Sequence, residues 1–192
     1  GSSSTIKVSQ SVKYLGVLLS PNSNSSLEVN RRISQANVGF KLLKPFLKHK
    51  SLPLKWRLSI YHQIIRAILL YGLDSLSLDQ TSLSKLDAFH FKVLRTCLGI
   101  KSSFYHKIVA ETGVDCSNLS IHKSLCRLRL PEPTPTQILQ DSSLQLFGHI
   151  IRHPEEIAHK VIFGNCNQTR TIRGTHRSGK PRMHWLENML TL

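Results

Sequence analysis

Apolar residues recur at intervals of three and four along three long segments of this chain, and that spacing predicts amphipathic α-helices packed into a bundle. The first helix is expected over residues 27–50. Its apolar face comprises Ile33, Ala36, Phe40, Leu43 and Leu47. The second opens near Pro53 and stops at Gly72, and the third runs over 81–98 and closes at Gly99. Pro45 is expected to kink or divide the first helix.

The rest of the chain predicts shorter elements. Alternating residues over 5–8 and 11–19 indicate a hairpin around Ser9 and Gln10. Short helices are expected over 104–112, 118–130, 137–152 and 181–190, with a further helical turn beginning at Pro154. The fold class is therefore mainly α, with an N-terminal β-hairpin, a helical bundle and a small basic C-terminal helical segment.

A proline-rich stretch divides the chain unevenly. Residues 131–135 read Pro-Glu-Pro-Thr-Pro, a composition typical of a stiff linker. We therefore expect four parts: a hairpin and turn over 1–26, a helical domain over 27–130, the linker over 131–136 and a basic helical segment over 137–192.

The net positive charge of the chain limits the kinds of partner that it can bind. The 192 residues carry 26 Lys and Arg against 11 Asp and Glu, a formal net charge of +15. Residues 1–73 hold a single acid, Glu28, and residues 157–192 hold only Glu187, whereas the stretch between them is neutral. Charge segregated in this way favours a polyanionic partner, with nucleic acid ahead of a membrane surface or a merely solvated basic face.

The candidate nucleic-acid-binding residues fall into two groups. Lys41, Lys44 and Lys48 share one face of the first helix, where they can meet successive phosphates. The track extends through Arg31, Arg32, Lys55 and Arg57. The second group lies in a glycine-bearing, acid-free loop, of a kind that orders on RNA. It comprises Arg170, Arg173, Arg177, Lys180 and Arg182.

Trp56 stands between two of these cations, Lys55 and Arg57. An aromatic ring among cations can stack on a nucleic-acid base. Burial in a helix interface is the favoured interpretation for this tryptophan.

Metal and cofactor chemistry is not expected. The chain has four cysteines, of which Cys97 is expected in the core, and no pair of them forms a CxxC motif. Cys116, His122 and Cys126 lie close in sequence but lack zinc-finger spacing. No apolar run approaches the roughly 20 residues of a membrane span.

The order of several short motifs resembles a known family. Tyr14-Leu15-Gly16 precedes Arg31-Arg32-Ile33, followed by Lys55-Trp56-Arg57-Leu58, Leu69-Leu70-Tyr71-Gly72 and Leu98-Gly99-Ile100, then Phe147-Gly148-His149 and Gly179-Lys180-Pro181-Arg182 with Trp185. This series resembles the C-terminal part of non-LTR (LINE-type) retroelement reverse transcriptases. The resemblance implies a palm-edge strand at Tyr14, a thumb over 27–99 that tracks a template–product duplex, and a post-thumb region from Gln137.

The departures from that family matter for function. Its catalytic Tyr-x-Asp-Asp motif and its endonuclease domains are absent from this sequence. The paired carboxylates that would hold catalytic metal ions therefore have no counterpart here. We expect no enzymatic activity from this chain, no cofactor, and binding to nucleic acid, with RNA favoured.

Three hypotheses about the biological role follow. The chain is a non-catalytic binding module derived from a retroelement polymerase, or a structural RNA-binding subunit of a ribonucleoprotein such as an organellar ribosome, where other proteins would be partners. Alternatively it is a fragment of an active polymerase whose palm precedes Gly1. Each places the chain inside the cell, in the nucleus or an organelle.

Overall fold

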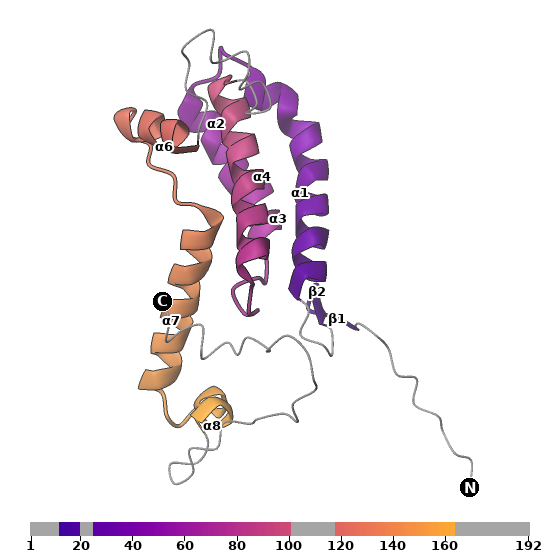
Figure 1. Ribbon diagram of the computed structural model, residues 1–192, viewed down its shortest axis with the longest axis vertical. Coiled ribbons are helices and arrows are strands. Elements are labelled where there is room, and N and C mark those ends of the chain that lie inside the picture. Colours follow the sequence, from indigo (N-terminus) through magenta and orange to yellow (C-terminus); the bar gives the residue numbers. More distant parts are fainter. Residues whose placement is uncertain (1–11, 20–24, 101–117, 164–192) are drawn as a thin grey trace, which may run out of the picture.

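The computed structural model describes residues 12–19, 25–100 and 118–163, and these form a helical bundle with a two-stranded hairpin at one end (Figure 1). The elements are β1 (Val12–Tyr14), β2 (Val17–Leu19), α1 (Ser25–Lys48), α2 (Leu54–Ile60), the π-helix η1 (Tyr61–Arg66), α3 (Ala67–Leu70), α4 (Gln80–Leu98), α6 (Asn118–Arg127), α7 (Pro135–Arg152) and α8 (Ile157–Phe163). The mainly helical fold with an antiparallel hairpin is confirmed. Expected elements over 5–8, 104–112 and 181–190 lie outside the described residues.

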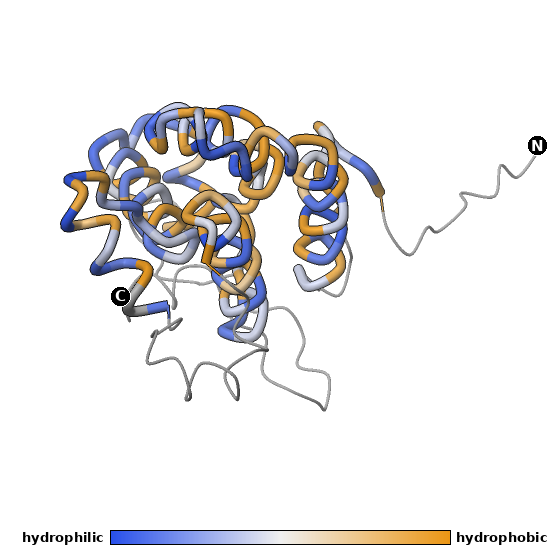
Figure 2. The backbone as a smooth tube through the Cα atoms, turned by 90° about the horizontal axis from the view of Figure 1, so that it is seen from above, coloured by the Kyte–Doolittle hydropathy of each residue, from blue (hydrophilic) through white to orange (hydrophobic). Residues whose placement is uncertain are grey.

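The three long helices pack around one apolar core. α1 lies against α4 on one side and against η1 and α3 on the other. The buried apolar side chains include Ala36, Phe40, Leu58, Ile65, Leu69, Leu86, Val93 and Cys97. Hydrophobic and hydrophilic residues alternate around the turns of these helices (Figure 2), as the three-and-four spacing predicts.

Two prolines behave differently in this bundle. α1 runs through Pro45 to Lys48, so the proline does not divide the helix. Pro53 precedes α2 at its N-terminus, where the absent N–H costs nothing. α2, η1 and α3 follow one another without a break in helical backbone, so the predicted second helix is one rod with a π-helical middle.

The described hairpin turns inside a stretch that the sequence predicted as one strand, whereas the expected turn at Ser9 and Gln10 lies outside the described residues. The strands pair antiparallel with Tyr14 opposite Val17, so the turn is Leu15-Gly16 and the expected strand over 11–19 is two strands. Both turn residues have positive φ, 45° for Leu15 and 81° for Gly16. Gly16 is a conventional turn residue, whereas leucine rarely adopts that conformation.

A buried carboxylate joins this hairpin to α1. Glu28 is fully buried, and it accepts hydrogen bonds from the Leu18 N–H (3.1 Å), Arg31 Nε (2.7 Å) and Arg32 Nε (2.6 Å). Both arginines also donate to the Gly16 carbonyl, at 2.6 Å from Arg32. Burial by itself raises the pKa of Glu28, but the hydrogen bonds from Arg31, Arg32 and Leu18 outweigh it, so the pKa is lowered from its usual value.

The end of α3 closes the same junction. The Tyr71 hydroxyl donates to the Leu15 carbonyl at 3.1 Å, and the Arg32 guanidinium lies over the Tyr71 ring at 4.6 Å. Gly72 has φ 69°, and a Cβ there would lie 2.4 Å from Val17 Cγ2. Only glycine fits that backbone conformation and that close approach.

The proline-rich stretch packs against the bundle. Glu132 is buried and meets His62 and Arg66 of η1, and Thr136 donates twice to the Asp87 carboxylate of α4, at 3.0 and 2.8 Å. Thr134 caps α7 through a reciprocal capping box with Gln137. The connection to α7 is therefore held at several points, and the division into separate domains stays a prediction.

Replacing Glu28 by Gln tests the junction. The amide leaves Arg31 and Arg32 without their counter-charge in a buried site, so we expect the free energy of unfolding to fall by about 3 kcal/mol. Urea unfolding followed by circular dichroism measures the change. The matched control is Glu155→Gln at an exposed carboxylate, which should leave the midpoint where it is. Equal midpoints for E28Q and the unmodified chain would contradict a structural role for this carboxylate.

Candidate nucleic-acid interface

The lysines predicted on α1 are exposed as a group. Lys41, Lys44 and Lys48 all lie on the solvent side of the helix, along the flank next to α4. Ala36 and Phe40 occupy the buried face of the same helix. The predicted segregation of basic and apolar faces on α1 is therefore confirmed, whereas contact with phosphate stays a prediction.

α4 adds two lysines that the sequence reading did not include. Lys85 Nζ lies 3.5 Å from Asn30 Oδ1, and Lys92 Nζ lies 3.2 Å from Asn37 Oδ1. Both pairs are separated by 55 residues, which places α4 parallel to α1 in a constant register. The Lys92 ammonium also lies 5.3 Å from the centroid of the Phe40 ring, so its stem is held against the helix interface.

Together these side chains make a continuous lysine row, defined as Lys41, Lys44, Lys48, Lys85 and Lys92. It runs from the level of Asn30 to Lys48, about 27 Å at 1.5 Å per residue. That length corresponds to roughly eight base pairs of a duplex at 3.4 Å per step.

Carboxylates on these two helices do not offset the row. α1 carries only Glu28, which is buried with its arginines, and α4 carries only Asp87, which accepts from Thr136. Asp79, just before α4, caps that helix by accepting from the Ser82 N–H. The acidic groups are used inside the fold or at its caps, so the surface along α1 and α4 is more positive than the net charge of the segments suggests.

Three predicted arginines are engaged by the protein itself. Arg32 is buried and Arg31 half-buried, both against Glu28 and the Gly16 carbonyl. Arg57 donates to the Cys97 carbonyl and, at 3.5 Å, to the Leu47 carbonyl, so it ties the start of α2 to the C-terminal ends of α1 and α4. Each of the three already donates to acceptors of the fold, which gives it a structural role, whereas a part in a phosphate track stays a prediction.

Lys55 and Trp56 lie in the first turn of α2 and both are exposed. Because Arg57 fixes this turn at the ends of α1 and α4, Lys55 adds a cation at the Lys48 end of the lysine row. Trp56 is 67% exposed, so its favoured placement in a helix interface was wrong. A tryptophan left in solvent is free to stack on a ligand.

The second predicted group lies outside the described residues. This holds for Arg170, Arg173, Arg177, Lys180 and Arg182, and also for Cys116. In the described part, Cys97 is buried as expected and His122 lies 3.8 Å from Cys126. Those described segments contain no group of three or more His, Cys, Asp or Glu side chains arranged to hold a metal ion.

The π-helix creates a polar cluster inside the core. The Tyr61 hydroxyl lies 2.6 Å from His90 Nδ1, with both side chains fully buried, and His62 Nε2 lies 2.6 Å from the Glu132 carboxylate. Burial, assisted by the charges of Arg66 and His62, lowers the pKa of His90 to about 3. Neither Tyr61 nor His90 reaches solvent, so this pair holds η1 against α4 and offers no access to a substrate.

This cluster generates a pH prediction. The pKa of His90 is about 3 when folded and 6.5 ordinarily, so its stabilising effect is complete above pH 6.5 and is lost as the pH falls toward 3. We expect a loss of about 2 kcal/mol by about pH 5. Unfolding curves at several pH values measure it. His90→Gln keeps a polar partner for Tyr61 and cannot titrate, so an identical pH slope in H90Q and the unmodified chain would refute the assignment.

Comparison of the chain with protein-family models, with curated proteins and with solved structures found no match. Within the described residues, no helix combines the length and apolar character needed to cross a membrane.

Proposed function

We propose that this chain binds the sugar–phosphate backbone of nucleic acid, RNA or an RNA/DNA duplex, and performs no catalysis by itself. The observation that carries the proposal is the lysine row along α1 and α4, with no free carboxylate on either helix. Five ammonium groups spread over about 27 Å match a linear polyanion better than a compact anion.

The chemistry of the row favours backbone contact over sequence reading. Lysine is a point charge on a flexible stem, without the planar fork with which arginine reads a guanine edge. Contacts of this kind position a nucleic acid and gain free energy from released counterions. Weak sequence preference and strong salt dependence are therefore expected.

The resemblance to the thumb of non-LTR reverse transcriptases agrees with this proposal and rests on the order of short motifs. Three of those motifs, containing Leu15-Gly16, Arg31-Arg32 and Tyr71-Gly72, meet at the junction around Glu28. Because these motifs meet at one place in the fold, their order and spacing along the chain have a structural explanation. Derivation from that family is part of the proposal, as is the alternative that the chain serves as a subunit of a ribonucleoprotein.

The two lysines on α4 provide the first test. Lys85→Gln with Lys92→Gln should weaken binding to RNA and DNA duplexes of unrelated sequence by about tenfold or more, and lower the slope of log affinity against log salt by about 0.9 for each lost contact. Fluorescence anisotropy over a salt series measures both. Lys123→Gln with Lys160→Gln removes the same charge from α6 and α8. An equal loss in that control pair would show that net charge alone, and not the row, drives binding.

Catalysis is tested by primer extension. With no paired carboxylates in a Tyr-x-Asp-Asp motif, we expect the purified chain to incorporate no nucleotide on a primed RNA or DNA template with either Mg²⁺ or Mn²⁺. A preparation from cells lacking the protein sets the background. Incorporation above that background would overturn the non-catalytic proposal.

A further inference from the structure

The first turn of α2 presents an exposed tryptophan on a fixed backbone. Trp56 is 67% exposed, whereas Leu58, two residues further on, is buried in the core. Two residues correspond to a rotation of about 200° in a helix, so the indole lies on the outer side of α2. The Arg57 guanidinium holds this turn by donating to the Leu47 and Cys97 carbonyls. The ring is therefore carried by a turn that is tied to two other helices.

Exposed cations accompany this tryptophan. α2 contacts both α1 and α4 at the end of the bundle opposite the hairpin, where the lysine row reaches Lys48 (Figure 1). Lys50 and Lys55 are exposed in the same stretch of chain. Between Glu28 and Asp74 the sequence contains no Asp or Glu. The ring therefore lies at one end of the lysine row, within a cationic stretch.

The surroundings of Trp56 differ from those of a protein interface. Among the exposed residues of the described segment 48–57, Trp56 alone has a large apolar side chain, and the others are Lys, His, Ser and Pro. Surfaces that receive another protein usually show a contiguous apolar patch. A single ring among lysines is the arrangement found where proteins bind single-stranded nucleic acid.

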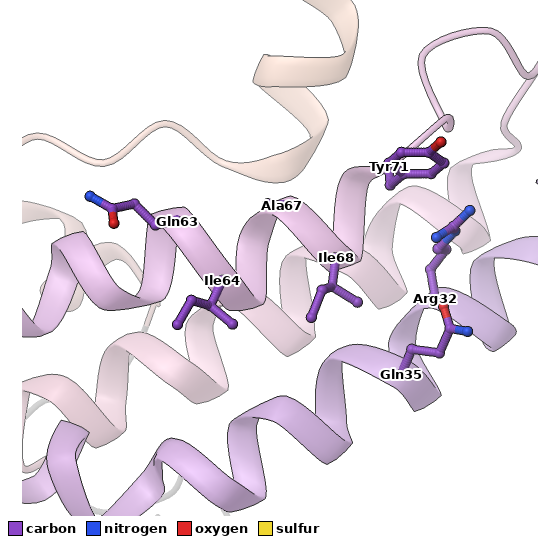
Figure 3. Close-up of a pocket in the computed structure, with 7 residues that line it drawn as sticks. All are labelled: Arg32, Gln35, Gln63, Ile64, Ala67, Ile68 and Tyr71. Carbon is purple, nitrogen blue, oxygen red and sulfur yellow. The ribbon is translucent and has the colours of Figure 1, made fainter. Parts of the chain in front are cut away.

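The apolar groups further along the same rod have a different setting. Ile64 and Tyr71 line an open pocket between α1 and the η1–α3 rod (Figure 3). The one cation that lines this pocket is Arg32, which already donates to acceptors of the fold. An anion therefore meets available lysines beside Trp56 and none along the lining of the pocket.

The faces of a nucleic-acid base are accessible only where the base is not enclosed in a duplex. Within a stem each base is covered on both faces by its neighbours, and the phosphates face outward. A stem lying along the lysine row therefore presents phosphates to the lysines. The indole can stack only on a base that is unpaired or at the end of the stem.

We infer that the nucleic acid bound by this chain is one in which a stem adjoins unpaired nucleotides, at a bulge, a loop or an end, and that Trp56 stacks on one of their bases. The inference rests on the proposed function, because the lysine row holds the stem. Lys50 and Lys55 neutralise phosphates next to the stacked base. The preference is for structure over sequence, since every base offers a face on which an indole can stack.

Fluorescence anisotropy with matched RNA ligands and the full chain tests the inference. One ligand is a stem of about eight base pairs with an extension of about five unpaired nucleotides, made in a 3′ and a 5′ version. Its partner carries the same extension with abasic sites, which keep the phosphates and remove the bases. We expect tighter binding of the base-containing ligand in at least one version, by about fivefold or more, the lower end of what stacking on an aromatic ring contributes.

Three variants assign that difference to the indole. Trp56→Ala should abolish it and leave the affinity for the abasic ligand unchanged, which also shows that the variant is folded. Trp56→Phe should retain part of it, because a smaller ring still stacks. Tyr14→Ala removes another exposed aromatic ring, from the hairpin, and should leave the difference intact.

Tryptophan emission reports the stacking itself. Trp185→Phe leaves Trp56 as the single tryptophan, and the base-containing ligand should then quench its emission more than the abasic ligand does. Equal quenching by the two ligands would overturn the inference, and so would a base-dependent affinity that survives in W56A. Binding to neither ligand would reject the proposed function and this inference with it, whereas equal binding to both, in the 3′ and the 5′ versions, rejects this inference alone.

Discussion

The hydrogen bonds of the buried Glu28 carboxylate fix the hairpin, α1 and the end of α3 relative to one another. It is the only acid in the first 73 residues, and it is fully buried between the hairpin and α1. Through Arg31 and Arg32 it holds the Gly16 carbonyl, and Gly16 lies against Tyr71 at the end of α3. A buried charge of this kind is stable only when its hydrogen bonds are satisfied. The hairpin, α1 and the end of α3 therefore have to be in place together.

Because the carboxylates are bound by other groups of the fold, they leave the outer surface of α1 and α4 positively charged. Glu28, Asp87 and Glu132 each accept hydrogen bonds from groups of the fold. The lysine side chains of α1 and α4 are exposed and have no carboxylate partner among the described residues; Lys85 and Lys92 donate to the neutral amides of Asn30 and Asn37. Charge counted by segment therefore misleads: residues 74–156 are neutral in sum, yet Lys85 and Lys92 from that stretch complete the lysine row. Attraction for a polyanion follows from where the charges lie.

α1 thus separates two surfaces of different chemistry. Its α4 flank is cationic and polar, and its α3 flank borders a largely apolar pocket lined by Ile64, Ala67 and Ile68. Arg57 fixes the start of α2 at the far end of both, beside the exposed Trp56. Binding of nucleic acid along the α4 flank, as proposed, is compatible with each of the biological roles that the sequence leaves open.

Helical periodicity made the core predictable, because burial on a 3.6-residue repeat is a local property of the sequence; Ala36, Phe89 and Cys97 were all placed correctly. The turn at Leu15-Gly16 was missed because tertiary contacts, and no ordinary turn residue, hold Leu15 at positive φ. Arg32 and Trp56 were misplaced because neither composition nor spacing shows that a guanidinium has a buried carboxylate, or that an aromatic ring lacks a partner. Lys85 and Lys92 were missed because the register of α4 on α1 is a long-range property.

Lysine acetylation footprinting, with and without a bound RNA duplex, tests whether nucleic acid binds along the lysine row. We expect Lys41, Lys44, Lys48, Lys85 and Lys92 to lose reactivity together when the duplex binds, whereas the exposed Lys123 and Lys160 keep theirs. Uniform protection of all seven, or protection confined to Lys123 and Lys160, would contradict a binding surface along α1 and α4.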